Sequence, residues 1–183
     1  MISKVVSNDE IFESVEIISD PKNYIESFKK NPSNKEYDPK IPGYVSHPKD
    51  KFNSFEGFRK KFIKKCKETF SENSLENVKT IFCGIDYPLT NIALLKFTVK
   101  KDINVTNLVI LYAYSIAYKL VYFLEDEDVG SLTGTLASNM LNRSISNGRF
   151  GIWGHYIEDL IYNGYSNVFI NGNEIFANFS CDS

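Results

Sequence analysis

The segment 146–160 concentrates the residue types that most often take part in catalysis. It contains the only tryptophan of the chain, Trp153, one of its two histidines, His155, and an acidic residue four positions later, Asp159. An imidazole that is oriented by a carboxylate can act as a general base, and Glu158 or Asp159 could orient His155 in this way. In an extended backbone the side chains of His155 and Asp159 would lie on the same face of the strand. The segment is therefore consistent with a small hydrolase or transferase that uses His155 with Asp159.

The same segment has an alternative interpretation as a packing element. Trp153 would fill the core, while Gly151 and Gly154 would let the chain turn around it. His155 would then hydrogen-bond a backbone group. The sequence marks no serine, threonine or cysteine as a nucleophile that the histidine would activate. Packing is therefore favoured over catalysis for this segment.

Metal and nucleotide sites are not indicated by the sequence. It lacks the P-loop, the dinucleotide-binding glycine pattern, H-E-x-x-H and G-x-S-x-G. The run Glu125–Asp128 offers carboxylates, but the calcium-loop spacing is not met because Gly130 comes too early. The three cysteines are scattered and include no C-x-x-C pair. We therefore expect no metal and no cofactor, and we expect the acidic run to follow a helix in a solvated loop that could contact a basic partner.

Residues 54–72 predict an amphipathic helix with one basic face. Ser54 can cap the start of this helix. Its apolar stripe consists of Phe55, Phe58, Phe62, Cys66 and Phe70. The candidate binding residues on the opposite face are Arg59, Lys60, Lys64 and Lys65.

The charges of the chain are unevenly distributed around this helix. Residues 51–70 hold seven Lys or Arg and two Glu, whereas residues 71–183 hold seven Lys or Arg and twelve Asp or Glu. A cationic face of this kind can meet phosphates or an acidic partner, although a solvated helix face is the simpler explanation. Nucleic acid is the less favoured partner, because the aromatic residues that would stack on bases belong to the opposite stripe.

Residues 107–125 predict the longest helix, with Thr106 as its N-cap. A mild face of this helix bears Tyr114 and Tyr118, which we expect to be exposed and available for binding. The apolar run is only about 17 residues long, at the lower edge of the range for a membrane span, and it contains Lys119. We therefore expect a buried helix and no membrane span.

The remaining elements complete an α+β pattern. The first fifty residues carry five of the six prolines and predict an N-terminal extension, 1–50, with short helices near 8–19 and 21–30 followed by an irregular segment. The other expected elements are strands at 78–83, 92–99, 156–162, 167–170 and 175–179, turns at 163–164 and 171–172, and a long loop at 129–150. We therefore predict a single α+β domain over 51–183, with two main helices packed on a small, mostly antiparallel sheet, a C-terminal β-meander and the N-terminal helical extension.

Composition and charge narrow the classes of protein to consider. The chain has 183 residues, of which 43% are hydrophobic, and this is enough for one sizeable core. Its formal net charge of -2 argues against a polybasic protein. The N-terminus shows no apolar signal segment, and the odd number of cysteines predicts no disulfide framework. We therefore expect an intracellular protein in the cytoplasm.

A resemblance is carried by the segment 142–164, which reads Asn-Arg-Ser at its start and contains Gly-Ile-Trp-Gly-His-x-Ile-x-Asp-Leu before its last glycine. It resembles the C-terminal part of small proteins encoded by large AT-rich DNA viruses, mimivirus-like ones in particular. The resemblance covers about the last 90 residues of the chain, and the Lys-, Asn- and Ile-rich composition is compatible with an AT-rich genome. It implies a viral protein located in the host cell or the virion, but no activity and no role for any residue.

These observations leave three hypotheses for function. The first is a non-enzymatic accessory protein whose partner is another protein, with contacts made by the basic helix, by Tyr114 and Tyr118, and by Trp153 and His155. The second is the hydrolase or transferase described above. The third is a nucleic-acid-associated protein that uses the basic helix over 59–67.

Overall fold

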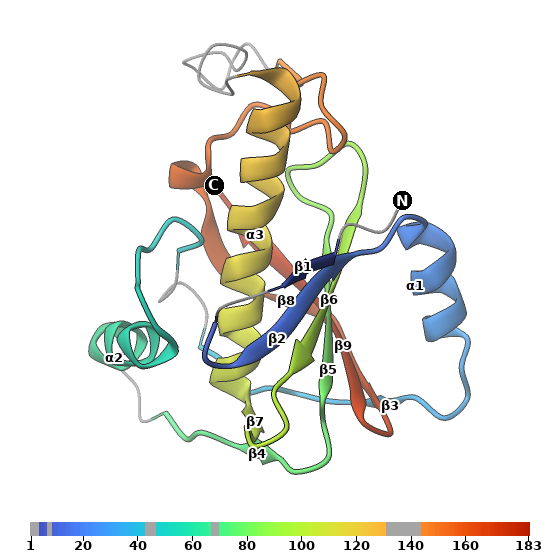
Figure 1. The fold of residues 1–183 in the computed structure, drawn as a ribbon, viewed down its shortest axis with the longest axis vertical. Helices are drawn as coiled ribbons and strands as arrows, with labels where there is room; N and C mark the ends of the chain where they lie inside the picture. Colours follow the sequence, from blue (N-terminus) through green and yellow to red (C-terminus); the bar gives the residue numbers. More distant parts are fainter. Residues whose placement is uncertain (1–3, 7–8, 43–46, 67–69, 131–143) are drawn as a thin grey trace.

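The computed structural model describes residues 4–6, 9–42, 47–66, 70–130 and 144–183. These residues form three α-helices, a mixed sheet of seven strands and a two-stranded ribbon, with 30% helix and 31% strand. The fold class is therefore α+β. Figure 1 shows the layers from left to right as α2, α3, the sheet and α1. Part of the expected 129–150 loop, 131–143, lies outside the described residues.

The seven strands of the main sheet lie in the order β1-β2-β6-β5-β9-β8-β3. Neighbouring strands are antiparallel except β5 and β9, which run parallel. The sheet is therefore larger than the small one expected, and strands from the first forty residues form both of its edges. The strands are β1 (Lys4–Val6), β2 (Phe12–Ile17), β3 (Lys35–Glu36), β5 (Thr80–Ile85), β6 (Ala93–Val99), β8 (Ile161–Asn171) and β9 (Glu174–Asp182), and the separate ribbon pairs β4 (Ser74–Leu75) with β7 (Val105–Thr106).

The prediction of a helix near 8–19 is wrong, because this segment forms β2. It pairs with β6 through a register that places Val15 opposite Phe97, with a bulge after Phe12. The apolar spacing fits a helix and a bulged strand equally well, and the β-branched residues favour the strand. The first fifty residues are consequently no helical extension, since β1, β2 and β3 all join the sheet.

The three helices begin where the sequence predicts. In α1 (Pro21–Lys29) the Asp20 side chain accepts a hydrogen bond from the third residue of the helix, and Ser54 and Thr106 do the same for α2 (Phe55–Lys65) and α3 (Asn107–Val129). Such caps satisfy backbone N–H groups that have no partner within the helix. The helix ends differ from the expected ones, because α2 stops at Lys65 and α3 continues through the acidic run.

The core is built around α3, which packs on one face of the sheet. The α2 helix packs on α3 instead of on the sheet, and the ring of Tyr112 lies 5.3 Å from the ring centroids of Phe55 and Phe58. On the other face of the sheet α1 buries Ile25 and Phe28 against Phe82, Leu94 and Phe176. The prediction that both main helices pack on the sheet therefore holds only for α3.

Among the described residues, α3 is the one helix that is long and apolar enough to cross a membrane. Its most apolar window is 72% buried inside the protein, which is the pattern of a core helix in a soluble protein. The sheet and α2 therefore provide the environment that the apolar residues of α3 require.

The C-terminus is a two-stranded hairpin and not a three-stranded meander. The predicted turn at Asn171-Gly172 is present between β8 and β9, and Gly172 has a positive φ of 59°. The predicted turn at Asn163-Gly164 is instead a register shift inside one continuous strand, β8. A bulge at glycine bends a strand without ending it.

Replacement of Phe82 tests how α1 is held on the sheet. This ring is 1% exposed and lies 4.9 Å from the ring of Tyr24 and 6.5 Å from that of Phe28. We expect Phe82→Ala to lower the free energy of unfolding by about 3–5 kcal/mol in a urea titration, because it leaves a cavity under α1. Phe123→Ala is the matched control, since Phe123 is 58% exposed. Equal losses for the two variants would contradict the packing described here.

Candidate functional site

The segment that contains Trp153 and His155 lies against the connection between β5 and β6. Isolated bridges join Leu89 to Ile152 and Ile145 to Trp153. The N–H of Trp153 donates to the carbonyl of Pro88 over 2.9 Å. These backbone bonds fix the segment against the β5–β6 connection, and the Tyr122 hydroxyl near the end of α3 donates to the carbonyl of His155 over 3.0 Å.

His155 is 2% exposed, and its Nε2 lies 2.8 Å from the hydroxyl of Tyr87. Its Nδ1 has no hydrogen-bond partner among the described residues. Asp159 is exposed, and its carboxylate accepts a hydrogen bond from the N–H of Tyr156 over 2.9 Å at the start of a short 3-10 helix, 157–159. The backbone there is not extended, so the two side chains do not share a strand face. The structure thus gives His155 and Asp159 different partners.

The acidic run contains a buried anchor, contrary to the expectation of a solvated loop. Glu125 is fully buried, and its carboxylate accepts hydrogen bonds from the Ser146 hydroxyl and from the N–H groups of Phe150 and Gly151, the latter two over 2.8 and 3.1 Å. A Cβ on Gly148 would lie 2.4 Å from the carboxyl carbon of Glu125, so a larger residue there would have to displace this carboxylate. The helix continues past Glu125 because these donors compensate the buried carboxylate.

A second carboxylate of the run ties the same segment to α3. The guanidinium of Arg149 donates to both carboxylate oxygens of Asp128 over 2.8 Å each, and the backbone N–H of Arg149 donates over 2.9 Å. These bonds from Arg149 lower the pKa of Asp128 to about 2. The positive partner also offsets the unfavourable position of an acidic residue at the C-terminus of a helix.

The two tyrosines expected on an exposed binding face are buried, so that expectation is wrong. Tyr114 is 1% exposed and Tyr118 is 0% exposed. The hydroxyl of Tyr118 donates to the carbonyl of Tyr87 over 2.6 Å, and that of Tyr114 lies 2.8 Å from the Sγ of Cys181. Burial raises the pKa of both phenols well above the ordinary value. Because the fold itself provides partners for their hydroxyls, these side chains belong to the core.

The basic face of α2 is only partly free. Arg59 forms an ion pair with Glu72 over 2.7 Å. Lys65 forms one with Asp50 over 2.5 Å. Lys60 lies 4.0 Å from a carboxylate oxygen of Glu56. Lys64 is exposed and has no ion pair within the described parts of the chain. The structure therefore brings the four predicted residues together on one helix, where three of them have an acidic partner and Lys64 does not.

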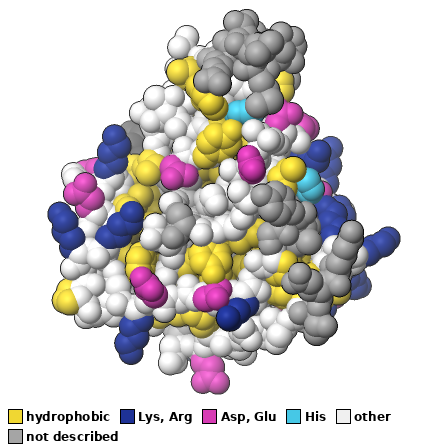
Figure 2. Space-filling model, turned by 180° about the vertical axis from the view of Figure 1, so that it is seen from behind, with side chains coloured by type: hydrophobic (Ala, Val, Ile, Leu, Met, Phe, Trp, Pro, Cys, Tyr) yellow, Lys and Arg dark blue, Asp and Glu magenta, His cyan; other side chains and the backbone are white. Residues whose placement is uncertain are grey.

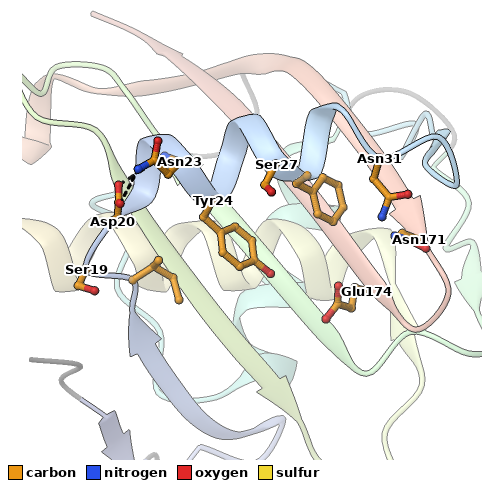
Figure 3. A pocket seen from close by; sticks show the side chains of 10 residues that line it. Ser19, Asp20, Asn23, Tyr24, Ser27, Asn31, Asn171 and Glu174 are labelled. Carbon is orange, nitrogen blue, oxygen red and sulfur yellow. Dashed lines mark hydrogen bonds between the residues drawn. The ribbon is translucent and has the colours of Figure 1, made fainter.

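A polar groove that the sequence did not reveal lies between α1 and the β8–β9 hairpin (Figure 3). It has a volume of about 540 Å³. Tyr24 and Ser27 come from α1, and Asn171 and Glu174 come from the hairpin, more than 140 positions later. No local spacing could have linked these residues, because the groove exists only once α1 has packed on the sheet.

Comparison with known proteins identifies no relative. No protein-family model, no curated protein and no solved structure matches the chain. Within the described residues, no group of three or more His, Cys, Asp or Glu side chains could hold a metal ion. The function must therefore be argued from the surfaces of this fold alone.

Removal of the Glu125 carboxylate tests its role as an anchor. We expect Glu125→Ala to lower the free energy of unfolding by about 3 kcal/mol, because it leaves buried N–H groups of Phe150 and Gly151 without an acceptor. Amide hydrogen exchange at these two positions should accelerate at least by the factor that corresponds to this loss of free energy. Glu127→Ala removes a neighbouring exposed carboxylate and serves as the control. An equal effect of both variants on stability would contradict the anchor.

The pair of Asp128 and Arg149 predicts a specific dependence of stability on pH. The pKa of Asp128 is lowered from 3.8 to about 2 in the folded protein, so the pair stabilises the fold above pH 3.8 and this contribution is lost as the pH falls towards 2. Arg149→Met should therefore lower stability by less than about 1 kcal/mol at neutral pH, since the pair is largely solvated. Near pH 2 the unfolding curves of Arg149→Met and of the original protein should give the same stability. A difference that persists there would rule out Asp128 as its source.

Proposed function

We propose that this chain is a non-enzymatic accessory protein that binds an acidic partner protein through the outer face of α2. The observation that carries the proposal is the exposed set Lys60, Ile63 and Lys64, in which Ile63 is 42% exposed. Ile63 and Lys64 follow Lys60 by three and four residues, so each of them neighbours Lys60 on the helix surface. An exposed aliphatic side chain beside ammonium groups suits a partner that offers carboxylates around an apolar contact.

The α2 helix, which bears this face, is held in place by its buried aromatic side chains. Phe58 and Phe62 are 3% and 2% exposed, and Phe58 packs against Tyr112 of α3. A face carried by a packed helix loses little conformational entropy on binding. Figure 2 shows the back of the molecule, where acidic side chains lie among hydrophobic ones in the middle and most Lys and Arg side chains lie towards the two sides.

Nucleic acid is the less favoured occupant of the same face. The aromatic side chains of α2 point into the core, so the described outer face offers no ring for base stacking. Glu56, Glu72 and Asp50 lie among the cations and reduce the positive potential that a phosphate backbone requires. The proposal includes a location in the cytoplasm. For a viral protein this location is the host cell or the virion.

The hydrolase or transferase hypothesis gains nothing from the geometry. His155 is buried beside Tyr87, and Asp159 binds the backbone of Tyr156. A general base must reach the proton that it abstracts from a substrate, and an imidazole that is 2% exposed and faces Tyr87 gives no support for such access.

Charge reversal on α2 tests the proposed function. We expect the full chain to bind poly-L-glutamate at low ionic strength in fluorescence anisotropy, and Lys60→Glu/Lys64→Glu to weaken this binding by about tenfold, which corresponds to the loss of two exposed charge pairs. Lys22→Glu/Lys29→Glu makes the same change of net charge on α1 and should leave the affinity nearly unchanged.

Two outcomes would refute the proposal. If Lys22→Glu/Lys29→Glu weakened binding of poly-L-glutamate as much as Lys60→Glu/Lys64→Glu, the affinity would depend on net charge alone. Tighter binding of polyuridylate than of poly-L-glutamate, sensitive to the α2 variant, would assign the face to nucleic acid.

A further inference from the structure

The groove beside α1 has the size of a small-molecule site. Its volume of about 540 Å³ falls within the range of about 300–1,000 Å³ that ligand pockets in proteins occupy. Figure 3 shows side chains from α1 along one side and from the β8–β9 hairpin along the other, with the hydroxyl of Tyr24 directed towards Glu174. The groove lies on the opposite side of the sheet from α3, and it is therefore separate from the α2 face.

The lining of the groove is polar and neutral or acidic. Its polar side chains include Ser19, Asn23, Tyr24, Ser27, Asn171 and Glu174. Neither Lys, Arg nor His is among the residues that line it. Amides and hydroxyls offer donors and acceptors side by side. The lining therefore disfavours an anion, which would meet the carboxylates of Asp20 and Glu174.

Several of these groups are available to a ligand. Within the described residues the carboxylate of Glu174 and the hydroxyl of Tyr24 have no hydrogen-bond partner, whereas Asp20 already holds the amide of Asn23 over 2.7 Å. Burial, and then the charge of Glu174, raise the pKa of Tyr24 to about 12, so the phenol keeps its proton and can donate. Its ring is held in place by Phe82 at 4.9 Å.

We propose that this groove binds a neutral polyhydroxylated ligand, namely a saccharide. Each sugar hydroxyl both donates and accepts a hydrogen bond, which matches the mixed lining of Ser27, Asn171 and Glu174. The ring of Tyr24 provides an apolar surface for the C–H groups of a sugar. A cation would pair with Glu174 but, having no acceptor, would gain no hydrogen bond from the amide donor of Asn171.

NMR of the ¹⁵N-labelled full chain tests this proposal. The probes are the neutral trisaccharides of glucose, mannose and N-acetylglucosamine, with spermidine and inorganic phosphate for comparison. We expect at least one saccharide to cause saturable shifts in the side-chain amides of Asn23 and Asn171. Asn171→Ala should raise its dissociation constant by about fivefold to tenfold, as expected for the loss of one or two hydrogen bonds.

Matched variants separate binding from folding. Asn163→Ala removes the same side chain from an exposed position of β8 outside the groove, and should leave binding unchanged. Ser27→Ala lies on the surface of α1, where alanine favours the helix, and should weaken binding without loss of stability. The proposal is overturned if no saccharide shifts the groove amides, if Asn163→Ala weakens binding as much as Asn171→Ala, or if spermidine binds in place of the saccharides.

Discussion

The burial of the apolar part of α3 is the constraint on which the rest of the structure depends. A helix that is apolar on almost every side has no stable place at a surface, because the hydrophobic effect favours covering all of it. The sheet covers one side, and α2 covers another through Tyr112 and its aromatic neighbours. The central position of α3 therefore follows from its composition, and the outer layers follow from the need to enclose it.

Each end of α3 carries a buried polar side chain that holds a distant segment. At its start the amide of Asn107 donates to the carbonyls of Pro39 and Ser71, over 2.8 and 3.2 Å. Near its end Glu125 accepts from Ser146 and from the backbone that follows it. Buried polar groups must be paired, so each anchor specifies one arrangement of the chain that crosses it. The two anchors thus fix irregular segments that hydrophobic burial alone would leave poorly defined.

Local signals were sufficient for part of this fold and insufficient for the rest. The caps at Asp20, Ser54 and Thr106 and the turn at Asn171-Gly172 depend on a few neighbouring residues, and the structure contains all of them. The strand β2 was missed because its apolar spacing fits two periods, and pairing with β6 decides between them. The roles of Tyr118 and Glu125 depend on partners far away in sequence. The positive mean hydropathy of the long helix was the one available sign that its tyrosines are buried.

The residues whose types most suggest a reactive site in the sequence serve in the structure to stabilise the fold. His155, Tyr87, Trp153 and Glu125 all lie where an irregular segment closes over the end of α3. A polar group in such a place stabilises one backbone arrangement through its hydrogen bonds. A ligand that replaced these hydrogen bonds would release the segment. Binding without loss of the fold is therefore expected where polar groups are not needed internally, namely on the outer layers formed by α1 and α2. These two helices lie on opposite sides of the α3 core, so that ligands at the two surfaces can be accommodated independently.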